Sequence, residues 1–451
     1  MKTSLFSEFD PVSAKAYKQK IQFDLKGADY NETLVWQSLE GIHVRPFYHK
    51  DEVKKTPAIP LPKQWFIGEK IFINHAIQSA ETANSAIANG VEAVYFQANK
   101  PFDIAALFTT LSDASVPLYF DLSFLDAQFY KELYRYSDKY ELVVKLDIIN
   151  HLALDGNWFT NLNKDHQDFK EVIQEATSSF TIDTTLYQNA GGTMVQQLAY
   201  GMAQLAEYLN FCEQENLKLE EVVVEVSVGT NYFFEIAKLR ALRELAQTVL
   251  SAFSYQDTAI KIVAHPSRRN KTIYDYNTNM LRTTTECMSA VLGGADWVVN
   301  MPYDALYHKT NDFGQRISRN QLIVLKEESY FDAVQNAADG SYYVEELTHQ
   351  LAEKALTLFK DIERNGGLLK QLKDGTVQRK IKESATREQQ LFDEGVITLL
   401  GTNKHPNQDD KMKDNLELYP FVKINPRKTI IEPIIMRRLA ETVEKERLKT
   451  E

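Results

Sequence analysis

A chain of 451 residues is too long for one ordinary core, so we expect one large domain of barrel size with additional elements. Its composition is globular, and neither a membrane span, a secretory signal nor a transit peptide is recognisable. The net charge of −11 disfavours a nucleic-acid partner, and two distant cysteines, Cys212 and Cys287, predict a reduced cytoplasmic protein without a metal site.

Residues 1–62 are predicted to form an irregular N-terminal extension with short helical pieces. After it, apolar runs alternate with amphipathic stretches. The predicted strands are 71–74, 93–97, 118–122, 143–148, 181–186, 222–228, 260–264 and 297–300, with helical patterns at 81–88, 127–136, 169–177, 194–213, 233–254 and 283–292. This alternation predicts an α/β fold, a (β/α)8 TIM barrel over residues 63–310. A doubly wound sheet is the alternative, but its glycine-rich phosphate turn is missing after the first strand.

The rest of the chain is polar and helical. Patterns at 313–328 and 344–363 predict long helices within a segment, 311–400, that packs on the barrel. Residues 401–451 are interpreted as a polar linker and a C-terminal helix that begins at about Pro433. In that helix basic residues such as Arg438 alternate with acidic ones such as Glu444 at helical spacing, which predicts solvated ion pairs rather than a binding patch.

Three titratable residues fall on predicted strands or at their ends. Asp121 and Asp147 are interpreted as ion-paired barrel residues, and His265 as a hydrogen-bonded structural histidine. Because no acidic or lysine constellation is recognisable at the strand ends, an unrelated barrel hydrolase or aldolase is disfavoured.

Four stretches resemble the methylmalonyl-CoA mutase family, in the family's order and with similar spacing. They are LKGADYNETLVW at 25–36 followed by EGI at 40–42, NYFFEIAKLRALR at 231–243, LRTTTECMSA at 281–290 running into GGAD at 293–296, and ADGSYYVEELT at 338–348. Most of these residues fit scaffold positions: Gly293-Gly294 predicts the left-handed end of a helix, and Gly340-Ser341 the start of another.

The resemblance implies a part in interconverting methylmalonyl-CoA and succinyl-CoA, with adenosylcobalamin supplying the radical. In the family the CoA arm runs along the barrel axis, and a separate C-terminal domain holds cobalamin through an Asp-x-His-x-x-Gly motif. None of the nine histidines here has an aspartate two positions before it, and about 30 residues after the linker are too few for such a domain. We therefore expect no cofactor-binding residue in this chain, and adenosylcobalamin on a partner subunit.

Two departures concern the family's active site. Catalytic subunits carry a Tyr-His pair after the fifth strand, where this chain reads TTLYQNAGG at 184–192, so we expect no catalytic residue and no activity of the chain alone. After the seventh strand, Ser267, Arg268 and Arg269 replace small residues and a tryptophan. They could line a channel for an acyl-CoA and bind its phosphate, or plug the barrel or meet a subunit, and we favour the structural interpretation.

These departures match the small subunit of the family's heterodimeric branch, which is an isomerase only together with a large catalytic subunit. We expect the N-terminal extension to contact that subunit through Leu34, Trp36 and Ile42, so that removing residues 1–44 abolishes association while the barrel still folds. Two alternatives stay open: the barrel half of a split acyl-CoA mutase that acts with a separate cobalamin protein, and a non-enzymatic assembly scaffold.

Overall fold

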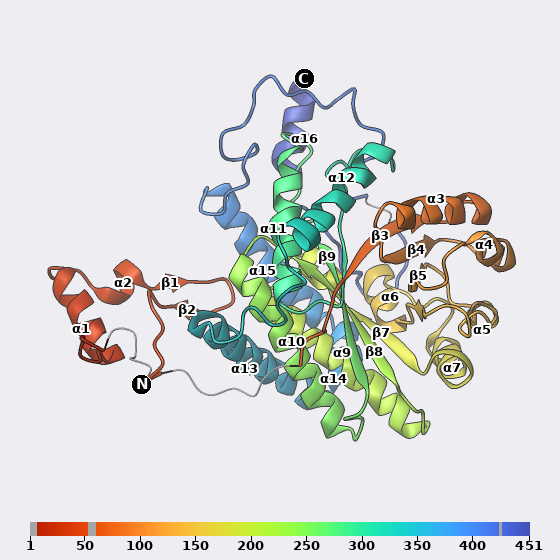
Figure 1. The fold of residues 1–451 in the computed structure, drawn as a ribbon, viewed down its shortest axis with the longest axis horizontal. Coiled ribbons are helices and arrows are strands. Elements are labelled where there is room, and N and C mark those ends of the chain that lie inside the picture. The colour runs from red at the N-terminus through yellow and green to blue at the C-terminus, as the bar shows by residue number, and fades with distance from the viewer. Residues whose placement is uncertain (1–6, 53–59, 424–425) are drawn as a thin grey trace.

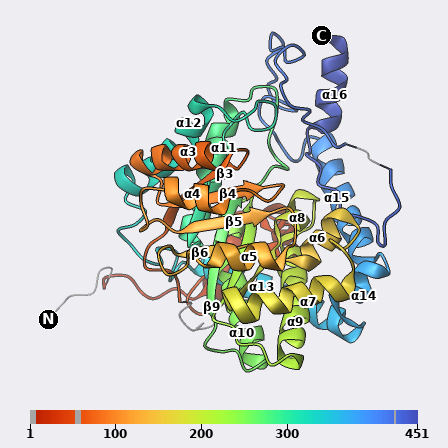
Figure 2. The same ribbon diagram turned by 90° about the vertical axis from the view of Figure 1, so that its right-hand side faces the viewer.

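A ring of eight parallel strands forms the centre of the computed structural model, which describes residues 7–52, 60–423 and 426–451 (Figures 1 and 2). Neighbouring strands follow the order β6-β5-β4-β3-β10-β9-β8-β7, which confirms the predicted barrel. The strands are β3 (Phe66–Phe72), β4 (Ala93–Ala98), β5 (Leu118–Leu122), β6 (Leu142–Val144), β7 (Ser179–Asp183), β8 (Glu221–Val228), β9 (Ala259–Pro266) and β10 (Trp297–Val299).

The ring has a seam between β6 and β7, across which the described residues form no strand ladder. The N–H of Thr181 donates to the carbonyl of Leu146 at 3.1 Å, and the N–H of Asp183 donates to the Asp147 carboxylate at 2.8 Å. Lys145 Nζ lies 2.6 Å from the Asp183 carboxylate across the same gap. Side chains thus join the two strands where backbone pairing stops.

Helices cover the outside of the ring. They are α3 (Ala76–Ala88), α4 (Ile104–Thr110), α5 (Ala127–Tyr134), α6 (Ile148–Asp155), α7 (Leu162–Val172) with the π-helix Ile173–Thr177, α8 (Thr185–Asn189), α9 (Met194–Gln214), α10 (Tyr232–Ala252), α11 (Thr278–Leu292) and α12 (Asp312–Ile323) with the π-helix Val324–Glu328. The predicted strand 143–148 was too long because Asp147 caps α6 by accepting from the N–H of Asn150. As predicted, α11 ends before a left-handed glycine, Gly294.

The lower interior of the barrel is filled by aromatic and aliphatic side chains. Tyr95 and Tyr119 stack with ring centroids 4.5 Å apart, and Trp297 lies edge-on to Tyr119 at 6.1 Å. A Cβ on Gly68 would lie 2.7 Å from a Val299 methyl group, so only glycine fits there. At this level the barrel is a packed core rather than a passage.

A layer of C-terminal helices packs on one side of the barrel: α13 (Tyr342–Arg364), α14 (Gly367–Lys373) and α15 (Thr376–Asp393). Helix α13 contacts α9 and α10 through a buried stripe that contains Leu347, Leu351 and Ala355. Figure 2 shows α14 and α15 along this side, with α16 (Glu441–Thr450) beyond them. No helix of the described ranges is both long and apolar enough to cross a bilayer.

The C-terminal segment, residues 401–451, differs from its prediction in the position at which its helix begins. Helix α16 begins at Glu441 rather than near Pro433, because the backbone before it bonds to the barrel loops. The N–H of Ile434 donates to the carbonyl of Ala153 at 2.8 Å, and that of Leu439 to the carbonyl of Arg269 at 2.9 Å. The tail therefore crosses the carboxyl end of the barrel.

The N-terminal arm, residues 7–52, extends away from the barrel (Figure 1). It contains short helices, as predicted, α1 (Ala14–Asp24) and α2 (Tyr30–Leu34). They precede a hairpin of β1 (Trp36–Gln37) and β2 (His43–Val44), which the sequence did not predict. Side-chain caps explain the helices, because Ser13 accepts from Ala16 N–H and Asp29 accepts from two N–H groups of α2.

Candidate functional site

A cavity of about 810 Å³ opens at the carboxyl ends of the barrel strands, the end at which TIM barrels place their sites. Polar side chains in or directly after seven of the eight strands line it: Lys70, Gln97, Asp121, Lys145, Asp183, Glu225 and His265. An apolar layer would be at least as stable in a core, so this polar layer indicates a ligand site.

Lys145 lies at the centre of the polar layer. Its Nζ is 2.6 Å from Asp183, 3.1 Å from Glu225 and 3.8 Å from Asp121. Burial alone would lower the pKa of Lys145, but these carboxylates outweigh it and hold the pKa well above the usual value. Lys145 is therefore a charged ion-pair centre.

Glu225 is the carboxyl group of this layer that can carry a proton near neutral pH. Burial raises its pKa to about 7, although Lys145 opposes the shift. The hydroxyl groups of Tyr95 and Tyr119 donate to its Oε1 at 2.9 and 2.5 Å. His265 Nε2 lies 3.8 Å from the other oxygen, and burial followed by the charge of a neighbouring lysine holds the His265 pKa well below normal.

The three residues interpreted from strand positions have different roles. Asp121 is ion-paired as expected, and Gln97 also donates to it at 2.7 Å. His265 hydrogen-bonds the Val299 backbone, as interpreted, while its Nε2 has no hydrogen-bond partner among the described residues. The interpretation of Asp147 was wrong.

Asp147 is held by neutral donors instead of a cation. Gln204 Nε2 donates to it at 2.6 Å and the Tyr208 hydroxyl at 2.7 Å. Burial raises the Asp147 pKa to about 6. These donors come from α9, which the sequence did not place against this strand end.

The three residues after β9 point in different directions. Ser267 is buried, and its Oγ accepts from Arg269 N–H at 3.2 Å. Arg269 turns away from the cavity, with Nε 2.5 Å from Glu388 on α15 and Nη1 2.7 Å from the Arg437 carbonyl. Of these three residues only Arg268 lines the cavity, and it is exposed. Its backbone N–H donates to Asn189.

The polar layer at the strand ends was not recognised from the sequence. The prediction that these ends lack a constellation of acidic and lysine residues was wrong. The available signal was a charge inside an apolar strand, as at Lys70 in FIGEKIF and Glu225 in EVVVEVSV. Such a charge is buried only when a partner lies opposite, and the partners come from distant strands. No group of His, Cys, Asp and Glu residues in the described ranges is arranged to hold a metal ion.

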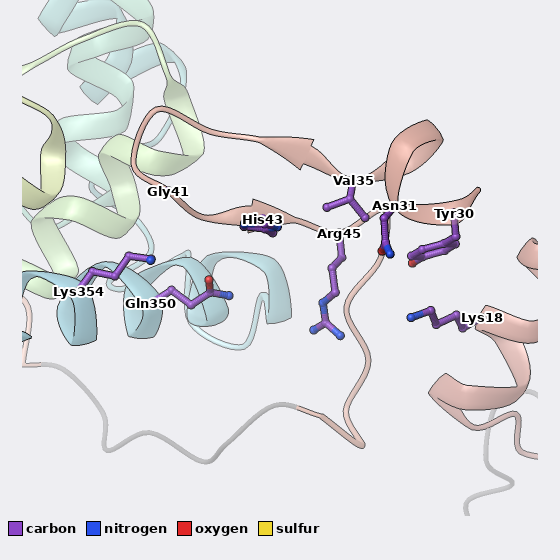
Figure 3. A pocket seen from close by; sticks show the side chains of 9 residues that line it. All are labelled: Lys18, Tyr30, Asn31, Val35, Gly41, His43, Arg45, Gln350 and Lys354. Carbon is purple, nitrogen blue, oxygen red and sulfur yellow. The ribbon is translucent and has the colours of Figure 1, made fainter. Parts of the chain in front are cut away.

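A second cavity, of about 480 Å³, lies between the N-terminal arm and α13. Figure 3 shows His43 and Arg45 on the hairpin above Gln350 and Lys354 of α13, with Lys18 at the far end. The lining is basic, although Arg45 pairs with Glu52 at 3.0 Å.

The three proposed partner-contact residues differ in exposure. Ile42 is fully buried in this chain and Leu34 is half-buried. Trp36 is 52% exposed, although its ring meets Phe234 of α10 edge-on at 5.7 Å.

Residues 136–445, more than half of the chain, match the family described as Methylmalonyl-CoA mutase. The chain belongs to this family. It is 31% identical to the methylmalonyl-CoA mutase small subunit of Porphyromonas gingivalis, covering 100% of this chain and 79% of that protein. It is also 31% identical to the large subunit of Propionibacterium freudenreichii subsp. shermanii, covering 53% of this chain and 34% of that one.

These matches confirm the family and the likeness to a small subunit that the four sequence stretches predicted. The chain spans only about a third of the mutase large subunit it matches. Among solved structures, a Plasmodium falciparum HPPK-DHPS is similar at 10% identity with a TM-score of 0.35, covering 60% of this chain and 47% of that one, too low to support an argument.

Proposed function

We propose that this chain is the small, non-catalytic subunit of a heterodimeric, adenosylcobalamin-dependent methylmalonyl-CoA mutase. A large subunit would convert methylmalonyl-CoA to succinyl-CoA. The observation that supports this most is the filled barrel, in which Tyr95, Tyr119 and Trp297 occupy the axis. A CoA arm has no path through such a core, which also counts against the barrel half of a split acyl-CoA mutase.

The residue at the position of the family's Tyr-His pair supports the same proposal. Tyr187 is fully buried, and its hydroxyl donates to Gln204 Oε1 at 3.2 Å. Burial and the nearby Asp147 raise the Tyr187 pKa well above normal, so it does not exchange a proton near neutral pH.

The histidines around the cavity do not fit a cobalt ligand. The Nε2 atom of His265 is buried, His308 lies between Asp304 and Asn415 at 3.3 and 3.2 Å, and His151 stacks on Phe159 with ring centroids 3.5 Å apart. Adenosylcobalamin would therefore be held by the partner subunit.

The N-terminal arm supports a partner contact. Phe23 on α1 is 79% exposed and Trp36 is 52% exposed, while Phe233 and Tyr342 on the body are also exposed. Large exposed aromatic side chains are typical of interface anchors. We place the large subunit over this arm, with its acidic side chains facing the basic cavity of Figure 3.

The test is complex formation with the large mutase subunit of the same organism. Because Ile42 is buried in this chain, deleting residues 1–44 would also remove part of its own core. The deletion to be tested is therefore shorter, residues 1–34, and keeps the hairpin. We expect the full chain to form a one-to-one complex and the deletion to abolish it, measured by size-exclusion chromatography. Circular dichroism should show a folded barrel in both.

Point variants sharpen this test. Combining Trp36→Ala with Phe23→Ser should weaken the complex by about tenfold or more. Phe313→Ser, which removes an equally exposed ring from α12, is the matched control and should leave it unchanged. A complex that survives the deletion, or rapid isomerisation by this chain alone with adenosylcobalamin, would refute the proposal. A complex that forms without raising turnover would favour an assembly scaffold.

A further inference from the structure

Three cations line the barrel-mouth cavity without an ion-pair partner among the described residues: Lys70 on β3, Arg268 after β9, and Lys309 in the loop between β10 and α12. Lys70 and Arg268 are the two that come from a barrel strand or its end. The Lys70 ammonium lies 4.6 Å above the Tyr95 ring, which is its side-chain contact. Arg268 lines the same cavity, and its backbone N–H donates to Asn189 Oδ1 at 2.8 Å.

The carboxylates of the floor do not pair directly with these two cations. Asp183 and Glu225 bind Lys145, and Asp121 accepts from Gln97 while facing the same lysine. Burial lowers the pKa of Lys70. The charges of Asp121 and Glu225 oppose this shift, and the smaller effects of Lys145 and Arg268 add to it. An anion between Lys70 and Arg268 would give each cation the direct partner that no carboxylate of the floor supplies.

The cavity walls also restrict the size of a ligand. Phe72, Leu154 and Met436 line the cavity and are partly exposed, so they offer an apolar surface. Below the floor, Tyr95 and Tyr119 close the barrel, so a ligand enters and leaves by the mouth alone. These features fit an anionic head with a short apolar body, and they leave no passage for a pantetheine arm.

We propose that the barrel-mouth cavity binds a small organic anion, a carboxylate or a phosphate, between Lys70 and Arg268. The guanidinium of Arg268 would pair with two oxygens of the anion, and the ammonium of Lys70 would contact it from β3, which is separated from β9 by β10 alone. This site is independent of the proposed subunit contact, since the N-terminal arm contributes no residue to the cavity.

The experiment measures thermal stabilisation of the full chain, with isothermal titration calorimetry, at low ionic strength. Succinate and inorganic phosphate are the two anionic probes, and acetyl-CoA is the third. We expect saturable binding of succinate or phosphate and none of acetyl-CoA. The better of the two anions identifies the ligand as a carboxylate or a phosphate.

Variants assign the binding to the two cations. Arg268→Gln and Lys70→Met should each weaken it by about tenfold or more. Arg364→Gln, an exposed arginine on α13, is the matched control and should bind like the natural chain. Arg268 is exposed, so its variant is expected to fold even where Lys70→Met does not.

Three results would overturn the inference: no saturable binding of either anion, equal binding by Arg268→Gln, or binding of the CoA ester alone. Association with the large subunit should be the same for Arg268→Gln as for the natural chain. If the natural chain forms the complex but binds neither anion, only this inference is refuted. If it binds an anion but forms no complex, only the subunit proposal is refuted.

Discussion

Both ends of the chain extend beyond the barrel, yet they relate to it in opposite ways. The C-terminal segment folds back over the barrel and buries Ile431, Ile434 and Leu439 in the body. The N-terminal arm extends outward and leaves Phe23 and Trp36 exposed. The difference indicates that the first segment stabilises this chain, whereas the second presents a surface to another molecule.

The anchors of the two segments differ in kind. Arg438 forms a buried ion pair with Glu444 at 2.7 Å and donates to the Lys271 carbonyl at 3.0 Å. The arm is held by buried Ile42 and by Glu40, which accepts from the N–H of Val195 at the start of α9.

The largest expected effect is at the C-terminal anchor. Arg438→Ala leaves Glu444 buried without its cation, so the free energy of unfolding should fall by about 3–5 kcal/mol. Urea unfolding followed by circular dichroism measures it. Lys449→Ala, which removes an exposed ion pair with Glu446 from the same segment, should cause no measurable change. Equal effects of the two variants would contradict the assignment of Arg438 as an anchor.

A smaller effect is expected at Glu40, whose attachment should depend on pH. Burial raises its pKa from 4.5 to about 7, although the N–H groups of Met194 and Val195 and the charge of Lys238 oppose the shift and Glu235 adds to it. A raised pKa means that the docked arm binds the proton more tightly than the free arm. Its stabilising contribution is therefore complete below pH 4.5 and is lost as the pH rises through about 7.

Hydrogen exchange of the hairpin amides at pH 6 and pH 8, corrected for intrinsic rates, measures this dependence. Because Glu40 is only partly buried, we expect a difference on the order of 1 kcal/mol. Glu40→Gln keeps an acceptor for Val195 without a charge and should remove the difference. Glu32→Gln, on the exposed helix α2, should keep it. An unchanged pH dependence in Glu40→Gln would show that another group is responsible.

The smallest effect on the isolated chain is expected at Trp36. Its half-exposed ring meets one aromatic partner, so Trp36→Ala should lower the free energy of unfolding by about 0.5–1 kcal/mol. Ile42→Ala, in the same hairpin but fully buried, should cost about 2–4 kcal/mol. Thermal unfolding of both variants tests this order, and a reversed order would mean that Trp36 stabilises its own chain rather than an interface.

The sequence predicted the barrel because the alternation of strands and helices repeats eight times, but it predicted the polar layer poorly. The first strand was placed at 71–74, whereas β3 spans Phe66–Phe72, because Gly68 and the charged pair Glu69 and Lys70 interrupt the apolar run. Gly68 is required by packing and Lys70 faces the cavity, and both reasons depend on strands far away in the chain.

The tail illustrates the same limit. Arg438 and Glu444 have the spacing of a solvated helix, yet both are buried because the preceding backbone bonds to the barrel loops. Local spacing cannot distinguish the two cases, since burial depends on where the tail docks. The four family stretches identified the family because scaffold positions retain their residues along the chain, but they contain neither Lys70, Lys145 nor Glu225.

The seam between β6 and β7 divides the barrel into two halves that are each continuous in sequence, β3 to β6 and β7 to β10. On the opposite side the halves share the ladder between β3 and β10, whereas at the seam they are joined largely by Asp147 and Lys145. Separation there requires the loss of fewer backbone bonds than anywhere else in the ring. We therefore expect the ring to open first at this seam, which lies at the wall of the barrel-mouth cavity.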